Sequence, residues 1–113
     1  PATRHLVDAA VIHALGPQGI LVNIARGSVV DQAAALAALR AGELGGAGLD
    51  VLEREPTPAT EFADLDQVSL MPHVGSATHE TRAAMAQLVL DNVAAFMDSG
   101  KLLTPVAARE WQS

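Results

Sequence analysis

The chain has 113 residues, 50% of them hydrophobic, with no cysteine and a formal net charge of −6 at pH 7. This length suits one domain with one core, and the lack of cysteine leaves no disulfide framework and no thiolate metal site. The acidic balance argues against nucleic acid or an anionic membrane as a partner, and no apolar run approaches the roughly 20 residues that span a bilayer.

The first part of the chain predicts a helix, a strand and a second helix. A short helix is expected at 8–15, where an Asp can cap the start and Gly-Pro follows the end. The compact apolar run at 20–24 is typical of a strand, and Arg26 lies in the turn after it. Asp31 can cap a second, alanine-rich helix that ends at Gly42.

The second part predicts two more strands and a long helix. The strands are expected at 49–52 and 68–71, separated by an acidic loop at 53–66. The last helix is expected to begin near 76–78 and to end at Gly100. One face of it is expected to be buried, as core or as a surface facing another domain, because apolar side chains recur there at helical spacing. These are Met85, Leu88, Val89, Val93, Phe96 and Met97.

This order of elements predicts the α/β class. Alternating strands and helices build parallel sheets, because parallel neighbours need crossover connections. The pattern corresponds to half of a doubly wound sheet followed by a long C-terminal helix. No Gly-x-Gly-x-x-Gly motif occurs, and the glycines at 42, 45, 46 and 48 precede a predicted strand instead of following one. We therefore expect that the half that would bind a pyrophosphate is not contained in these 113 residues.

Three polar side chains follow the ends of the three predicted strands. Arg26, Glu55 and His73 are a cation, a carboxylate and an imidazole. Chemistry in open parallel sheets gathers at the carboxyl ends of the strands, so we expect these groups to meet there. Together they would form a clamp for an anionic substrate and a paired acid and base.

The motifs that carry these residues resemble those of one family. Asn-x-Ala-Arg-Gly at 23–27, Gly-Ala-x-Leu-Asp-Val at 46–51 with Glu-Pro at 55–56, and Pro-His-x-Gly at 72–75 occur in that order. In this respect the chain resembles the D-isomer-specific 2-hydroxyacid dehydrogenases, in particular those of the glyoxylate/hydroxypyruvate reductase type. The resemblance extends over about residues 1–106.

The resemblance implies a fold and an activity. Residues 1–106 would be the second half of a doubly wound (Rossmann) NAD(P)-binding domain, and 107–113 a C-terminal tail. The parent protein would be an oxidoreductase that transfers hydride between NAD(P)H and a small 2-oxo or D-2-hydroxy acid such as glyoxylate or hydroxypyruvate. With no signal peptide before Pro1, we expect a cytoplasmic protein. An unpaired strand edge favours a homo-oligomer, most simply a dimer.

The resemblance also implies roles for individual residues. Arg26 would bind the 2-oxo acid, His73 would be the general acid and base, and Glu55 would pair with it. Asp50 would lie near the nicotinamide amide. The residues expected to line the NAD or NADP cofactor are Thr3, Ile24, Ala25, Asp50, His73, Gly75 and Ser76.

The chemistry of these residue types agrees with such roles. Reduction of a carbonyl carbon by hydride requires a proton for the oxygen, and an imidazole titrates near the operating pH. The planar fork of Arg26 suits a carboxylate better than a lysine would. Asp50, placed inside an apolar strand, needs a hydrogen-bonding partner, because an unpaired buried carboxylate is costly. A ligand amide is one possible partner.

Other interpretations stay open at this point. The chain could belong to a dinucleotide-sensing binding module, or serve as a structural or dimerisation fragment. The isolated piece is expected to bind cofactor very weakly and to be inactive. His5, His13 and His79 are expected to be scattered surface or helix residues. We expect no metal, because the spacing of His73 and His79 matches no usual zinc pattern.

Overall fold

The computed structural model describes residues 2–56 and 59–106. The chain divides into two compact units, Pro1–Gly75 and Ser76–Ser113, which are described separately below. The tail expected at 107–113 lies outside the described residues. Within the described part of the chain, no helix is long and apolar enough to cross a membrane.

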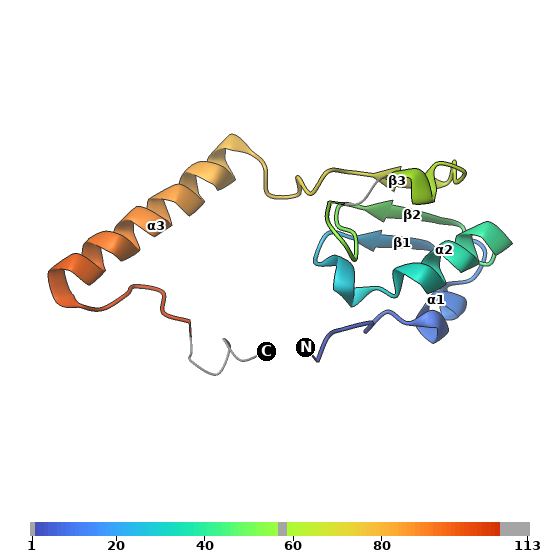
Figure 1. Cartoon of the computed structure of the whole chain (residues 1–113), viewed down its shortest axis with the longest axis horizontal. Coiled ribbons are helices and arrows are strands. Elements are labelled where there is room, and N and C mark those ends of the chain that lie inside the picture. Colours follow the sequence, from blue (N-terminus) through green and yellow to red (C-terminus); the bar gives the residue numbers. More distant parts are fainter. Residues whose placement is uncertain (1, 57–58, 107–113) are drawn as a thin grey trace. The chain divides into compact units, whose positions relative to one another are not determined.

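The first unit is built on a three-stranded parallel sheet. Its strands are β1 (Ile20–Asn23), β2 (Gly46–Leu49) and β3 (Val68–Leu70), side by side in that order (Figure 1). Ile20 is in register with Gly46, and Ala47 with Val68. Because all three strands run the same way, their carboxyl ends lie at one edge of the sheet. The predicted α/β class with a parallel sheet is confirmed.

Two helices precede and follow β1. In α1 (Ala9–Leu15), the Asp8 side chain accepts the N–H groups of the first turn. In α2 (Gln32–Ala41), Asp31 does the same, and Gly42 ends the helix in the left-handed conformation. These capped ends confirm the predicted helix boundaries. Two short 3₁₀ helices, η1 (Gly27–Val29) and η2 (Ala59–Phe62), complete the unit, the second inside the predicted acidic loop.

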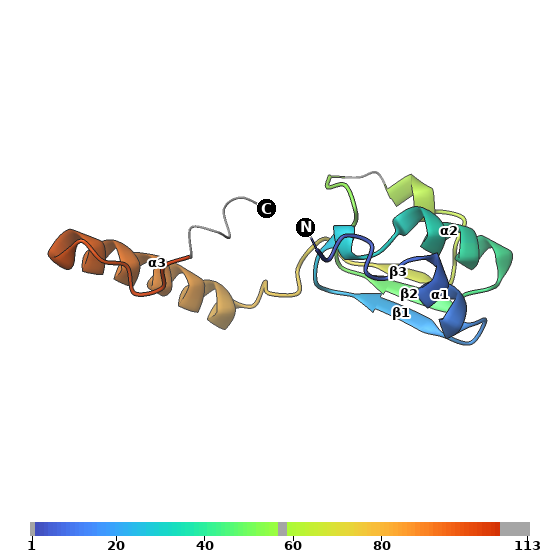
Figure 2. The ribbon, with the colours of Figure 1, turned by 90° about the horizontal axis from the view of Figure 1, so that it is seen from below.

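The core lies on one face of the sheet. Figure 2 shows α2 along this side. The buried side chains come from both helices, the strands and the loop before β3; the largest are Ile12, Leu21, Leu36, Leu39, Leu44, Leu49, Phe62 and Leu65. Along β1 the burial alternates, as expected for a strand covered on one side. The opposite face exposes Ile20, Val22 and the following Ile24, each about two thirds or more accessible.

The second strand differs from its predicted position. We expected it at 49–52, whereas the structure places it at Gly46–Leu49. The sequence pattern follows apolar side chains, but the ladder is made by backbone groups, and the small residues at this position allow close neighbours. A Cβ on Gly46 would lie 3.0 Å from the carbonyl oxygen of Gln67. Asp50 is therefore the first residue beyond the strand and not a residue within it.

The second unit contains one long helix, α3 (His79–Ser99). Thr78 caps its start by accepting the N–H of Thr81 at 3.1 Å, and Gly100 ends it. The prediction of a buried face is wrong for the described residues, because no residue of α3 is buried. In the described part of this unit, only residues 76–78 and 100–106 accompany the helix, so little is present to cover that face. That the stripe faces another domain stays a prediction.

Candidate active site

The turn after β1 is shaped by the side chain of Asn23. This amide is 5% exposed. Its oxygen accepts the N–H of Ala25 at 3.1 Å, and its Nδ2 donates to the carbonyl oxygen of Arg26 at 3.0 Å. The Arg26 guanidinium is exposed and donates through Nη1 to the Ala25 carbonyl at 2.7 Å. Asn23 was not predicted to have a role, although an amide at the end of an apolar strand is a usable signal.

The turn after β1 touches the loop after β2. Gly27 is buried, and a Cβ on it would overlap the backbone of Leu52 and Glu53. No larger residue fits there without a shift of backbone. The position of the turn that carries Arg26 is therefore tied to the position of the loop that carries Glu55.

Asp50 connects the end of β2 to the turn after β3. Its carboxylate is 7% exposed, and its two oxygens accept the N–H groups of Val74 and Gly75, both at 2.8 Å. The bond from Val74 lowers the pKa of Asp50; burial opposes this effect, and the bond from Gly75 adds to it. The partners found are thus backbone amides of the protein, where the sequence suggested a ligand amide.

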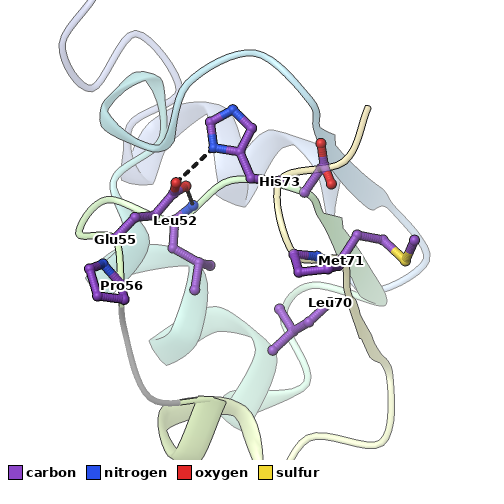
Figure 3. Close-up of a pocket in the computed structure, with 8 residues that line it drawn as sticks. Leu52, Glu55, Pro56, Leu70, Met71 and His73 are labelled. Carbon is purple, nitrogen blue, oxygen red and sulfur yellow. Dashed lines mark hydrogen bonds and ion pairs between the residues drawn. The ribbon is translucent and has the colours of Figure 1, made fainter. Parts of the chain in front are cut away.

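His73 and Glu55 form a hydrogen-bonded pair (Figure 3). Nδ1 of His73 lies 2.7 Å from Oε2 of Glu55, while Oε1 of Glu55 accepts the Leu52 N–H at 2.8 Å. The hydrogen bond from His73, followed by that from Leu52, lowers the pKa of the Glu55 carboxyl. An ionised carboxylate only accepts, so Nδ1 carries the proton and Nε2 is left for a ligand.

The pair borders an open hollow of about 600 Å³ at the carboxyl edge of the sheet. In Figure 3, Leu52, Glu55 and Pro56 lie on one side of this hollow, and Leu70 and Met71 on the other. Asp50, Pro72 and His73 complete its lining. The walls are thus mostly apolar, with two carboxylates and an imidazole as the polar groups, an arrangement typical of small-ligand sites.

The structure brings some of the predicted site residues together and leaves others apart. Asp50, Glu55 and His73 share the hollow, but Arg26 is not among its lining residues. Thr3 and Ile24 are exposed. The carbonyl of Thr3 accepts the N–H of Leu6 in a turn. Ala25 takes part through its backbone only, Gly75 donates to Asp50, and Ser76 begins the second unit.

A second imidazole–carboxylate pair was missed. Nε2 of His5 lies 2.9 Å from Oε1 of Glu53, and Arg4 donates to the same oxygen at 2.7 Å. The expectation that His5 is a scattered surface residue is wrong. No local spacing could have revealed this pair, because 48 residues separate its members.

Comparisons with known proteins place the chain in a family. The family model described as "D-isomer specific 2-hydroxyacid dehydrogenase, NAD binding domain" matches residues 1–75. A hydroxyphenylpyruvate reductase of Plectranthus scutellarioides is 52% identical over 94% of this chain and 34% of its own length. The glyoxylate/hydroxypyruvate reductase A HPR2 of Arabidopsis thaliana is 53% identical over 92% of this chain and 33% of its own length.

The fold has equally similar counterparts among solved structures. The NADPH-dependent glyoxylate/hydroxypyruvate reductase of Sinorhizobium meliloti, in complex with NADP and malonate, superposes with a TM-score of 0.88 and 50% identity, over 94% of this chain and 33% of that one. The chain thus spans about a third of the length of the relatives that it matches. From the matched family model and these identities, the chain belongs to the D-isomer-specific 2-hydroxyacid dehydrogenase family, as part of its NAD-binding domain.

Proposed function

We propose that the whole protein containing this chain transfers hydride between NAD(P)H and a small 2-oxo or D-2-hydroxy acid, such as glyoxylate or hydroxypyruvate. The observation that carries the proposal is the His73–Glu55 pair, 2.7 Å apart and bordering the hollow at the carboxyl edge of the sheet. Relatives named glyoxylate/hydroxypyruvate reductases support the substrate class.

The residues present fit the nicotinamide end of a dinucleotide. Each oxygen of Asp50 accepts one backbone N–H, and a carboxylate oxygen can accept a second hydrogen bond, so a carboxamide can still be bound. Ile24 offers an exposed apolar side chain at the end of β1. When bound, the nicotinamide supplies the hydride. With no glycine-rich fingerprint in the chain, the residues leave open whether the cofactor is NAD or NADP.

His73 would provide the proton. Its Nδ1 is held by Glu55, so Nε2 is the nitrogen that can give a proton to the carbonyl oxygen during reduction and take it back from the hydroxyl during oxidation. Glu55 stays ionised while it accepts two hydrogen bonds. Its negative charge stabilises the imidazolium that carries the proton.

Arg26 would bind the substrate carboxylate. Its guanidinium is exposed at the same edge of the sheet. Among the described residues it donates one hydrogen bond, to the carbonyl of Ala25, so most of its donors are left for an anion. A planar fork can hold the carboxylate by two parallel hydrogen bonds. Because Arg26 does not line the hollow in this structure, its side chain would have to rotate toward the substrate carboxylate.

His73→Ala in the full-length protein tests the proposed reaction. We expect kcat for reduction of glyoxylate or hydroxypyruvate to fall by about 10²–10⁴-fold, as for loss of a general acid. His13→Ala, at an exposed position of α1, is the matched control and is expected to keep wild-type activity. Undiminished turnover in His73→Ala would overturn the mechanism. A wild-type protein that binds NADH or NADPH but turns over none of these acids would be a sensing module instead.

A further inference from the structure

The loop that carries Glu55 is held by two imidazole–carboxylate pairs. Glu53 bonds to His5, and Glu55, two residues further, bonds to His73. Both histidines have positive φ angles, 50° for His5 and 55° for His73. Non-glycine residues seldom adopt this conformation unless the surrounding contacts hold it. The loop is thus fixed at both of its carboxylates by residues in constrained positions.

Glu53 is surrounded by partners. Arg4 and His5 both contact its Oε1, at 2.7 and 2.9 Å, and its side chain is 22% exposed. Its backbone N–H donates to Oε1 of Gln32 at 2.9 Å. The hydrogen bond from His5, followed by that from Arg4, lowers the pKa of Glu53. The second carboxylate near His5 is Asp31, 3.8 Å from Nδ1.

The segment that carries these contacts is itself anchored. The N–H of His5 donates to the carbonyl of Ser28 at 2.9 Å, and the N–H of Val7 donates to that of Val29 at 3.0 Å. The histidine is therefore fixed by its backbone against the turn that follows Arg26. A side chain held in this way can set the position of the carboxylate that it contacts.

The backbone of Leu52, the residue before Glu53, links this cluster to the reacting pair. The Leu52 N–H donates to Oε1 of Glu55, and the Leu52 carbonyl packs against Gly27. A shift of Glu53 would therefore move the donor that orients the Glu55 carboxylate.

We propose that His5 and Glu53 are positioning residues for the Glu55–His73 pair: through the backbone of Leu52, whose N–H donates to Glu55, they set the orientation of the Glu55 carboxylate. The catalytic consequence rests on the proposed function, whereas the effect on Glu55 does not. Neither residue lines the hollow, so each acts through Glu55 and not on the substrate.

The titration of the Glu55 carboxyl group measures directly whether His5 and Glu53 orient it. In the full-length protein carrying this chain, ¹³C NMR of the side-chain carboxyl carbons would follow Glu55 in the wild type, His5→Ala, Glu53→Ala and the double variant. We expect Glu55 to titrate about half a pH unit higher in each single variant, because the Leu52 N–H no longer aligns with it. The double variant should equal Glu53→Ala, since His5 acts only through its contact with Glu53. An unchanged Glu55 titration in both single variants would overturn the proposal.

Rescue separates positioning from general loss of structure. In His5→Gln, the side-chain amide can still donate to Glu53, so we expect its Glu55 titration to return close to that of the wild type. A result for His5→Gln equal to that for His5→Ala contradicts the proposal. Arg40→Ala, which removes an exposed ion pair with Asp64, is the matched control and should leave Glu55 unchanged. If His5→Ala does not fold, Arg4→Ala at a more exposed position should raise the Glu55 titration by a smaller amount.

Kinetics test the consequence for catalysis. We expect kcat for glyoxylate to fall about fivefold to tenfold in His5→Ala, with KM changed less than about twofold, because substrate binding does not involve Glu55. A rise in KM with unchanged kcat would contradict a role through the acid and base. A wild-type protein without reductase activity would refute the proposed function, while the NMR titration would still decide the positioning of Glu55.

Discussion

Asp50 and Gly75 are joined by a hydrogen bond of 2.8 Å from the Gly75 N–H to Oδ2, and a Cβ on Gly75 would lie only 2.9 Å from that same oxygen. The end of β2 and the turn after β3 are therefore fitted closely to each other. This turn begins with His73, whose φ of 55° is held in place by the bonds that Asp50 makes just after it. Asp50 thus holds the backbone of the turn that carries the imidazole.

Replacing Asp50 by Asn should loosen this turn. An amide side chain has only one acceptor, so one of the Val74 and Gly75 N–H groups would face an NH₂ group instead of an oxygen. We expect Asp50→Asn to lower the thermal midpoint by several degrees and to lower kcat in the full-length protein about tenfold. Calorimetry and steady-state kinetics measure the two effects. A stable variant with full activity would show that Asp50 does not hold the turn that carries His73.

The stability of the protein should fall in acid. Asp50 and Glu55 both have pKa values lowered in the folded state, the first chiefly by the Val74 N–H and the second chiefly by His73. Their contributions are complete above the ordinary carboxyl values near pH 4 and are lost as the pH falls through the lowered ones. Urea unfolding between pH 7 and pH 3 should show this loss. In the Asp50→Asn, Glu55→Gln double variant, the stability should depend less on pH over that range.

Asn23 should stabilise the turn that carries Arg26, as Asp50 stabilises the turn that carries His73. Asn23→Ala leaves the Ala25 N–H and the Arg26 carbonyl without the partners that a buried amide now supplies. We expect a loss of about 1–3 kcal/mol in the free energy of unfolding. In the full-length protein, KM for the 2-oxo acid should rise more than kcat falls. Asn92→Ala, which breaks side-chain bonds to Thr104 in the second unit, is the control for KM.

Gly27 should tolerate no larger side chain. A Cβ at this position would overlap the carbonyl group of Leu52, so backbone would have to move. We expect Gly27→Ala to cost about 3 kcal/mol in unfolding free energy. Gly48→Ala offers a matched comparison, because a Cβ there would meet only Cγ2 of Val22 at 3.8 Å and should be close to neutral. Equal stability of the two variants in urea unfolding would contradict the close fit of the two loops.

Much of the fold could be predicted because local signals and the structure agree. Asp8, Asp31 and Gly42 are capping residues whose role depends only on their immediate neighbours. The second strand was placed three residues too late, because glycine carries no side chain and its strand shows no apolar pattern. The face of α3 was predicted as buried from periodicity alone, which cannot say whether a partner is present to cover it.

The part of the site that follows from the order of the motifs along the strands could be predicted. The part that depends on contacts between residues far apart in the sequence could not. The positions of Glu55 and His73 after successive strands predict that they meet, and the structure places them 2.7 Å apart. The bonds of Asp50 to the turn after β3 required knowledge of the sheet register. The contact of His5 with Glu53 depends on how the first turn of the chain lies against η1, which no spacing reveals.

The uncovered face of β1 should make the 113-residue chain associate. Ile20, Val22 and Ile24 present apolar side chains on that face, and β1 is the outer strand of the described sheet. We expect sedimentation velocity to show mass increasing with concentration. Val22→Lys should shift the chain toward monomer, because it places a charge at the centre of the patch. Gln18→Lys adds the same charge at an exposed position before β1 and should leave the association unchanged. Equal association of both variants would mean that another surface, such as α3, is responsible.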